Sequence, residues 1–166
     1  MSNKIGLFTG SFDPVTNGHM AIIKSAGRLF DQLYVGLFYN KNKEGFFTAA
    51  KRRAMLEEAV AGLSNVKVLA AHDSLAVDIA GQIGVTHLVR GLRNGRDLEY
   101  ESELAFFNSH LAETIDTVFF LPPADLAHIS SSRIRELIHF HSDVSDFVPE
   151  SVVKEVEKLG EDFTSL

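Results

Sequence analysis

Three polar segments of this 166-residue chain carry residues that can bind phosphate. The first spans residues 9–19, Thr-Gly-Ser-Phe-Asp-Pro-Val-Thr-Asn-Gly-His. It offers an anion the N–H groups of a helix start, the Ser11 hydroxyl and the His19 imidazole. Gly10 and Gly18 predict close backbone approach and positive φ. Taken alone, His19 is one of seven histidines and is better explained as an exposed residue of a capped turn. The complete string favours phosphate chemistry.

The second and third segments add arginines and hydroxyls. Residues 90–93, Arg-Gly-Leu-Arg, place two multidentate anion donors around a glycine, and Arg96 adds a positive charge. Residues 129–135, Ile-Ser-Ser-Ser-Arg-Ile-Arg, predict a helix that opens on three serines. The first serine can cap the helix, and the next two can donate to a phosphate. The simpler alternatives are a solvated charge cluster and an ordinary serine cap.

A fourth segment, residues 40–48, is polar, contains a glycine and is long enough to move. Mobile loops over a site commonly act as lids. Lys43 and Lys41 both lie in it, and one of them can be merely solvated. Thr48 is expected to cap the helix that follows.

The elements that position these segments alternate between apolar runs and segments of helical period. We predict strands at Lys4–Thr9, Gln32–Phe38, Val66–Ala70, His87–Arg90 and Thr117–Leu121, and helices at Gly18–Phe30, Ala49–Leu63, Leu75–Ile83, Leu98–Leu111, Ser131–His141 and Pro149–Leu159, with Gly160 as the last stop. Continuously apolar strands indicate a parallel sheet. The prediction is an α/β, Rossmann-like, doubly wound five-stranded sheet with flanking helices and a C-terminal helix. Ligands of such sheets bind beyond the carboxyl ends of the strands.

The composition bounds the function. The length predicts one domain, residues 1–166. The absence of cysteine excludes disulfides and thiol nucleophiles and suits a cytoplasmic protein. The net charge of −6 argues against nucleic acid as a partner. No window approaches the ~18 apolar residues of a membrane span, so no membrane association is expected.

The motifs are similar to those of a known enzyme superfamily. Residues 16–19, Thr-Asn-Gly-His, fill the [HT]-x-G-H signature of the nucleotidylyltransferases, and residues 129–135 resemble their I-S-S-[ST]-x-[IV]-[RK] motif. Arg-Gly-Leu-Arg at 90–93 followed by Asp-x-Glu-Tyr-Glu at 97–101 resembles the bacterial phosphopantetheine adenylyltransferase family in particular. The resemblance covers about Lys4 to Leu159, nearly the entire chain.

That resemblance implies transfer of the adenylyl group of ATP to 4′-phosphopantetheine, giving dephospho-coenzyme A and pyrophosphate. It implies that His19 stabilises the transition state, assisted by Lys43 and Arg93. The implied ATP-binding residues are Ser11, Phe12, His19, Gly91, Leu92, Arg93, Glu101, Leu126, Ala127, His128, Ile129, Ser130, Ser131 and Ser132. The implied phosphopantetheine-binding residues are Ser11, Lys43, Ala76 and Arg90.

The resemblance also implies Mg²⁺ as cofactor, carried by ATP with no protein side chain as metal ligand. It implies coenzyme A as a feedback ligand at the same site, a cytoplasmic location and a homohexamer. Two assignments have an alternative: Glu101 can be an exposed helix residue paired with a neighbouring arginine, and Ala76 a small helix-surface residue. The chain departs from the family pattern at Thr9, at 94–96, at Ala76 and at 126–128.

Rival functions from two classes remain open at this stage. A sister enzyme that adenylylates nicotinamide mononucleotide shares the first and third motifs, but it usually carries His where this chain has Thr16, and a cytidylyltransferase is a more distant rival. A nucleotide-binding regulatory module without turnover is the rival from another class. The presence of His19, Lys43, Arg90 and residues 130–132 favours the enzyme.

Overall fold

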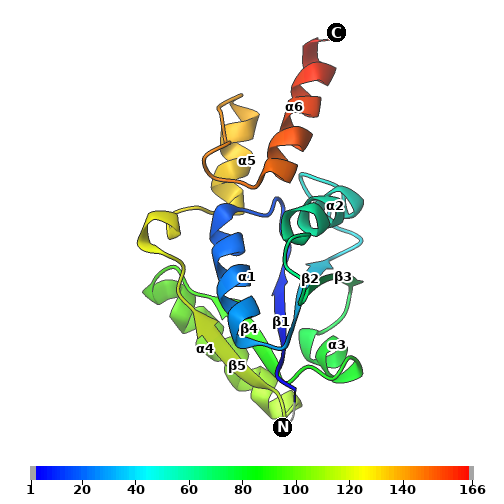
Figure 1. The fold of residues 1–166 in the computed structure, drawn as a ribbon, viewed down its shortest axis with the longest axis vertical. Helices are drawn as coiled ribbons and strands as arrows, with labels where there is room; N and C mark the ends of the chain where they lie inside the picture. The colour runs from blue at the N-terminus through cyan, green and yellow to red at the C-terminus, as the bar shows by residue number, and fades with distance from the viewer. Residues whose placement is uncertain (1–2, 165–166) are drawn as a thin grey trace.

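The computed structural model describes residues 3–164 and consists of a parallel sheet with helices on both faces (Figure 1). The strands are β1 (Ile5–Gly10), β2 (Gln32–Tyr39), β3 (Val66–His72), β4 (His87–Gly91) and β5 (Asp116–Phe120). The helices are α1 (Asn17–Leu29), α2 (Ala49–Val60), α3 (Ala76–Gln82), α4 (Gly95–Leu111), α5 (Ser131–His139) and α6 (Glu150–Thr164), with a short 3₁₀ turn η1 (Ala124–Leu126). The predicted fold class is confirmed.

The strand order is β3-β2-β1-β4-β5, and every pair is parallel. The chain winds outward from β1 to β3, returns to β4 beside β1, and then continues to β5. The winding direction therefore reverses between β1 and β4. In doubly wound sheets, the carboxyl ends of the strands at such a reversal flank the ligand-binding crevice.

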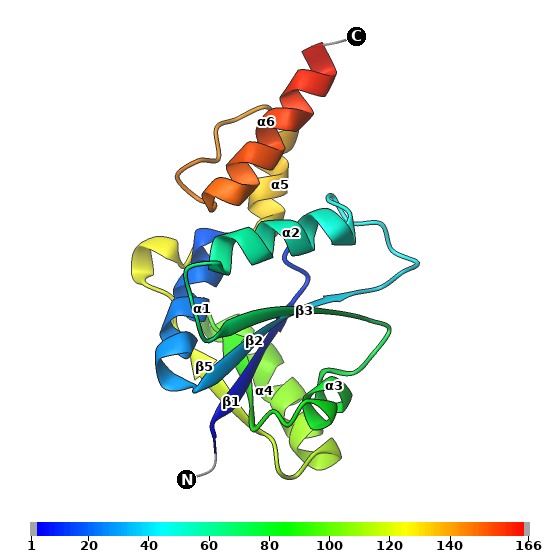
Figure 2. The same ribbon diagram turned by 45° about the vertical axis from the view of Figure 1, so that its right-hand side comes forward.

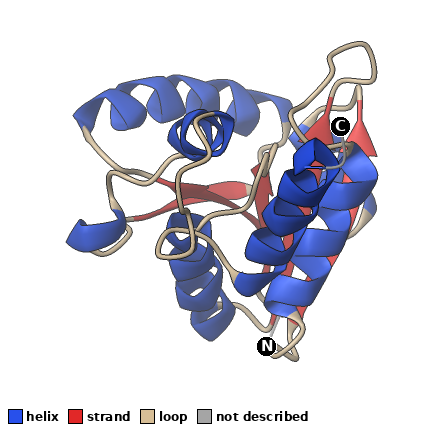
Figure 3. Cartoon of the chain, turned by 90° about the horizontal axis from the view of Figure 1, so that it is seen from above, coloured by secondary structure: helices blue, strands red, loops and turns tan. Residues whose placement is uncertain are grey.

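Two apolar clusters hold the layers together. The larger one packs α1, α2, α5 and α6 against one face of the sheet, and the smaller one packs α3 against the other. Leu7 and Leu37 are completely buried in neighbouring central strands. Figure 2 shows α5 and α6 stacked beyond the carboxyl ends of the strands, and Figure 3 shows helices on either side of the sheet from above. Over the described residues, no helix is both long and apolar enough to cross a membrane.

The predicted element boundaries are correct to within a few residues, with identifiable exceptions. Helix α6 continues through Gly160 to Thr164, so the predicted stop at that glycine is wrong. Helix α4 begins at Gly95, earlier than predicted, because the Asn94 side chain accepts a hydrogen bond from the Asp97 N–H and caps it. Thr48 caps α2 as expected, accepting from the Lys51 N–H.

Candidate active site

A cavity of about 440 Å³ lies at the reversal of the sheet, beyond the carboxyl ends of β1 and β4. The start of α1, the start of α4 and the start of α5 complete its wall. Most of the residues that the sequence assigns to phosphate binding line this cavity: Ser11, Phe12, His19, Arg90, Gly91, Arg93, Glu101, Leu126, Ile129, Ser130, Ser131 and Ser132. Leu92, Ala127 and His128 are their chain neighbours and lie outside the cavity wall. Three motifs that are far apart in the sequence thus meet around one space.

Helix α1 fixes the His19 ring. Thr16 is its N-cap, and its hydroxyl accepts from the His19 N–H at 3.3 Å. The Thr16 N–H in turn donates to His19 Nδ1 at 3.0 Å, so the two residues form a reciprocal capping box. The Phe12 ring stands edge-on to the imidazole, with ring centroids 5.0 Å apart. The imidazole is held from two sides by its own loop.

The backbone of that loop differs from the sequence-based expectation. Phe12, not Gly10 or Gly18, adopts positive φ, at 43°. Its side chain is buried at 1% exposure. The cost of this conformation is offset because the ring packs against both Phe8 and His19.

The protonation state of His19 follows from its surroundings. Burial and the nearby positive charge of Arg93 lower its pKa from 6.5 to about 4. The imidazole is therefore neutral at pH 7. Because Nδ1 accepts from the Thr16 N–H, the proton of the neutral ring resides on Nε2. His19 thus offers the cavity an N–H donor that needs no ionisation.

We expect His19 to remain neutral in the ligand-free protein down to about pH 4. Between pH 6.5 and 4 the unfolded chain binds a proton at this position and the folded chain does not, so the free energy of unfolding decreases as the pH falls through this window. A histidine-detected NMR titration measures the pKa of His19 and the tautomer of its ring. A His19 midpoint near 6.5, or a proton on Nδ1, would contradict the assignment.

Arg90 is the most strongly held cation of the cavity. Its Nε and Nη2 donate to the two carboxylate oxygens of Glu101, each at 2.7 Å. Its Nη1 donates to the Thr9 carbonyl at 3.0 Å and to the Thr9 hydroxyl at 2.7 Å. The alternative interpretation of Glu101 is therefore correct in that the residue pairs with an arginine. It is wrong in that Glu101 is not exposed: only 8% of the residue is accessible. The sequence did not predict the hydrogen bonds between Arg90 and Thr9, although Thr9 is one of the positions that depart from the family pattern.

Arg93 is held at the start of α4. Its Nε donates to Asp97 Oδ2 at 3.0 Å, and its backbone N–H donates to the same oxygen at 2.9 Å. Partial burial acts to raise the pKa of Asp97, but the hydrogen bonds from Arg93 outweigh it, and the net pKa is lowered. Asp97 lines the cavity and was missed as a site residue. Asp97 follows Arg93 by four positions at the start of a helix, and this spacing could have predicted the pairing of the two side chains.

The third motif contributes the N-terminus of α5. Ser130 caps the helix, as predicted, by accepting from the Arg133 N–H. The Ser131 hydroxyl donates to the Pro14 carbonyl at 2.8 Å, and the Ser132 hydroxyl accepts from Arg135 at 3.2 Å. The hydroxyls of these two serines therefore have hydrogen-bond partners within the protein. The backbone N–H groups of the first turn point toward the N-terminus of α5, which is the end of the helix at the cavity. Arg135 also lines the cavity.

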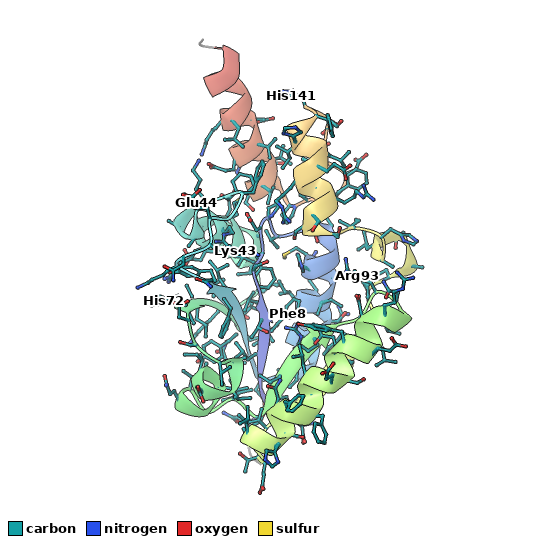
Figure 4. All side chains as sticks on the ribbon, turned by 180° about the vertical axis from the view of Figure 1, so that it is seen from behind. Phe8, Lys43, Glu44, His72, Arg93 and His141 are labelled. Carbon is teal, nitrogen blue, oxygen red and sulfur yellow. The ribbon has the colours of Figure 1, made fainter. Side chains whose placement is uncertain are left out.

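Two further sequence-assigned residues, Lys43 and Ala76, do not line the cavity. Lys43 is exposed in the loop between β2 and α2, and in Figure 4 it lies on the α2 side of β1, whereas Arg93 lies on the α4 side. Ala76 is the first residue of α3, on the other side of the sheet from α1, and packs partly against the smaller core cluster.

Among the described residues, no three His, Cys, Asp or Glu side chains are grouped so that they could hold a metal ion. The two carboxylates of the cavity are already paired, Glu101 with Arg90 and Asp97 with Arg93. The cavity therefore combines a neutral N–H donor, arginines and a helix N-terminus. This arrangement suits a polyphosphate anion.

Known proteins of similar sequence and fold agree with this chemistry. A family model described as cytidylyltransferase-like matches residues 7–137. A solved structure provisionally assigned as a nicotinate-nucleotide adenylyltransferase of Vibrio parahaemolyticus matches 93% of this chain and 99% of its own, with a TM-score of 0.67 at 18% identity, which shows a shared fold. The phosphopantetheine adenylyltransferase of Streptococcus mutans is 66% identical over 97% of both chains, and that of Streptococcus agalactiae is 57% identical over 96% of this chain and 99% of its own. The chain belongs to the phosphopantetheine adenylyltransferase family, within the cytidylyltransferase-like group.

Proposed function

We propose that the cavity between β1 and β4 is where this chain performs the reaction of its family. The chain transfers the adenylyl group of ATP to 4′-phosphopantetheine in coenzyme A biosynthesis. The products are dephospho-coenzyme A and pyrophosphate. The observation that carries the assignment of the site is the neutral His19, fixed with its Nε2–H available at the point where all three phosphate-binding motifs meet.

The proposed mechanism is direct in-line attack. A phosphate oxygen of phosphopantetheine forms a bond to the α-phosphorus of ATP, and the bond from that phosphorus to the bridging oxygen breaks and releases pyrophosphate. The nucleophile is already an anion, so the step needs no general base. Catalysis then consists of positioning, worth about 7–11 kcal/mol, and of charge stabilisation by donors worth roughly 10²–10³ in rate each.

Each donor has a proposed place in this step. His19 donates its Nε2–H to an α-phosphate oxygen as negative charge builds there. Arg93 and the N-terminus of α5 bind the ATP phosphates, and Arg90 binds the phosphate of phosphopantetheine. Lys43 approaches both phosphates from its exposed loop. The remaining sequence-assigned residues, Ser11, Phe12, Gly91, Leu92, Glu101, Ala76 and residues 126–129, shape the two substrate pockets.

We propose that Mg²⁺ enters with ATP, bound by its phosphate oxygens. Mg²⁺ commonly binds substrate phosphates rather than a cage of protein ligands. The pairing of both cavity carboxylates with arginines supports this arrangement. A chelator should abolish turnover, and added Mg²⁺ should restore it.

The experiment that tests the function measures pyrophosphate release from ATP and Mg²⁺ with either 4′-phosphopantetheine or nicotinamide mononucleotide as acceptor. Release with phosphopantetheine alone is the expected result. Release with the mononucleotide alone would mean that Arg90 to Arg93 do not select the acceptor. ATP binding without release in either case would instead favour a regulatory module.

Two finer properties belong to the same proposal. Coenzyme A contains the dephospho-coenzyme A product and adds one phosphate, so we expect it to compete for this cavity as a feedback ligand. A cytoplasmic location would give the enzyme access to ATP, and the absence of cysteine is compatible with it. Competition of coenzyme A with ATP and with phosphopantetheine in initial-rate measurements tests the first point.

We also propose that the chain assembles as a homohexamer. The outer face of α4 supports self-association, because several large apolar side chains on it are more than half exposed: Tyr100 at 61%, Phe106 at 67%, Phe107 at 54% and Leu111 at 60%. Such exposed apolar patches mark interaction surfaces. Light scattering coupled to size exclusion should give six times 18.3 kDa. The Phe106→Glu variant should dissociate to smaller species, whereas a hexamer that persists would place the interface elsewhere.

A further inference from the structure

A carboxylate outside the cavity wall joins the two loops that the reaction uses. Asp13 lies in the loop between β1 and α1, six residues before His19. Its Oδ2 accepts from the Phe46 N–H at 2.7 Å, and its Oδ1 accepts from the Phe47 N–H at 2.8 Å. The carboxylate is 7% exposed. We propose that Asp13 is a positioning residue for Lys43, a role that rests on the function proposed for that lysine.

The anchor that Asp13 makes is firm. Phe47 is 2% exposed and part of the larger core cluster, so the backbone is fixed at this point. A side chain at Gly45 would place Cβ only 2.9 Å from Asp13 Oδ2 and 2.9 Å from the Phe47 carbonyl oxygen. Glycine is therefore needed for the loop to approach the carboxylate so closely.

Two arginines hold the Asp13 loop itself in place. Arg52 of α2 is 5% exposed and donates from Nη1 to the Ser11 carbonyl at 2.9 Å. Arg135 of α5 donates from Nη1 to the Asp13 carbonyl at 2.7 Å. Neither arginine forms an ion pair with the Asp13 carboxylate among the described contacts, so both carboxylate oxygens serve the Phe46 and Phe47 amides.

Lys43 lies on the free part of the same loop. At the other end, the Lys43 N–H donates to the Asn40 carbonyl at 3.2 Å, and residues 41–46 are exposed. Phe46 follows Lys43 by three positions, so the backbone of Lys43 can lie at most about 10 Å from that anchor. Asp13 thereby limits the volume that Lys43 can reach, and it does so from the loop that leads into the helix of His19.

The test is the Asp13→Asn variant. An amide offers one acceptor oxygen where the carboxylate offers two, so one of the two N–H groups loses its partner. We expect kcat to fall about 10- to 100-fold, because a misplacement of about 1 Å can cost 10²-fold. In a Lys43→Ala background the same substitution should lower kcat by less than about 2-fold. Asp31→Asn is the matched control: Asp31 also accepts a backbone N–H, from Lys4, at the opposite end of the sheet, and turnover should be unchanged.

Equal effects of Asp13→Asn with and without Lys43 would overturn the proposal, since Asp13 would then act through folding or through His19. A Lys43→Ala enzyme with full activity would also overturn it, and would remove Lys43 from the proposed mechanism. Hydrogen exchange tests the anchor without any assay of turnover: the Phe46 and Phe47 amides should exchange at least about 10-fold faster in Asp13→Asn. If that variant does not fold, Gly45→Ala perturbs the same junction from the exposed side and should show the same dependence on Lys43.

Discussion

Replacing His19 by alanine is expected to lower kcat about 10²–10³-fold while ATP binding changes only a few-fold. The substitution removes the Nε2–H donor that we assign to the α-phosphate as negative charge builds there, a contribution of the size found for single donors of this kind. Arg93 and the N-terminus of α5, which we propose to bind the ATP phosphates, remain in place. Steady-state turnover together with ATP titration by calorimetry separates the two quantities.

The fold should survive this change, because His19 contributes one capping interaction worth roughly 1 kcal/mol. His139→Ala, in the last turn of α5 and exposed, is the matched control and should keep full turnover. A loss of only a few-fold in His19→Ala would remove His19 from the transition state. A parallel loss of ATP affinity would make it a binding residue instead.

Replacing Arg90 by alanine is expected to affect stability as well as turnover. Glu101 is 8% exposed, and its carboxylate accepts two hydrogen bonds of 2.7 Å from Arg90. Removing the Arg90 side chain therefore leaves a buried carboxylate without this partner. Breaking one side of such a pair costs on the order of 3 kcal/mol. The KM for phosphopantetheine should rise as well, because the proposed phosphate donor is absent. Chemical denaturation and initial rates measure the two effects.

A second substitution separates these effects. The Arg90→Ala/Glu101→Gln variant should recover much of the lost stability, because the unpaired charge is gone, but should not recover the KM. Arg93→Ala is the matched control for stability: its partner Asp97 has a 22% exposed side chain, and such pairs contribute about 0–1 kcal/mol. Equal destabilisation by Arg90→Ala and Arg93→Ala would mean that burial of Glu101 does not govern the cost.

The strands and helices could be predicted from the sequence because their signals are local. Apolar runs of β-branched and aromatic residues gave five parallel strands at nearly the observed positions. The predicted ends of helices were wrong where a specific tertiary or capping contact determines the end. The Asn94 cap started α4 early, and α6 continued past Gly160 because the propensity of one glycine, about 1 kcal/mol, does not end an amphipathic helix that packs on the core.

The motifs of the cavity were also visible in the sequence, since each one is a continuous string after a strand. In a parallel sheet the carboxyl ends of the strands share one edge, which explains why residues 9–19, 90–93 and 129–135 meet around one cavity. These motifs do not show which hydrogen-bond partner each side chain has in the folded protein. The capping box that sets the tautomer of His19 depends on the angle at which the loop enters α1.

The fold class, the phosphate-binding segments and the family could be predicted from the amino-acid sequence, because all three follow from short motifs and their order along the chain. The contacts of Arg90 with Glu101 and Thr9, and the hold of Asp13 on the loop of Lys43, became visible only in the folded molecule. These contacts join residues that are 11 to 81 positions apart. Such pairings depend on how buried polar groups find partners in the packed molecule, and no periodicity or motif spacing records that choice.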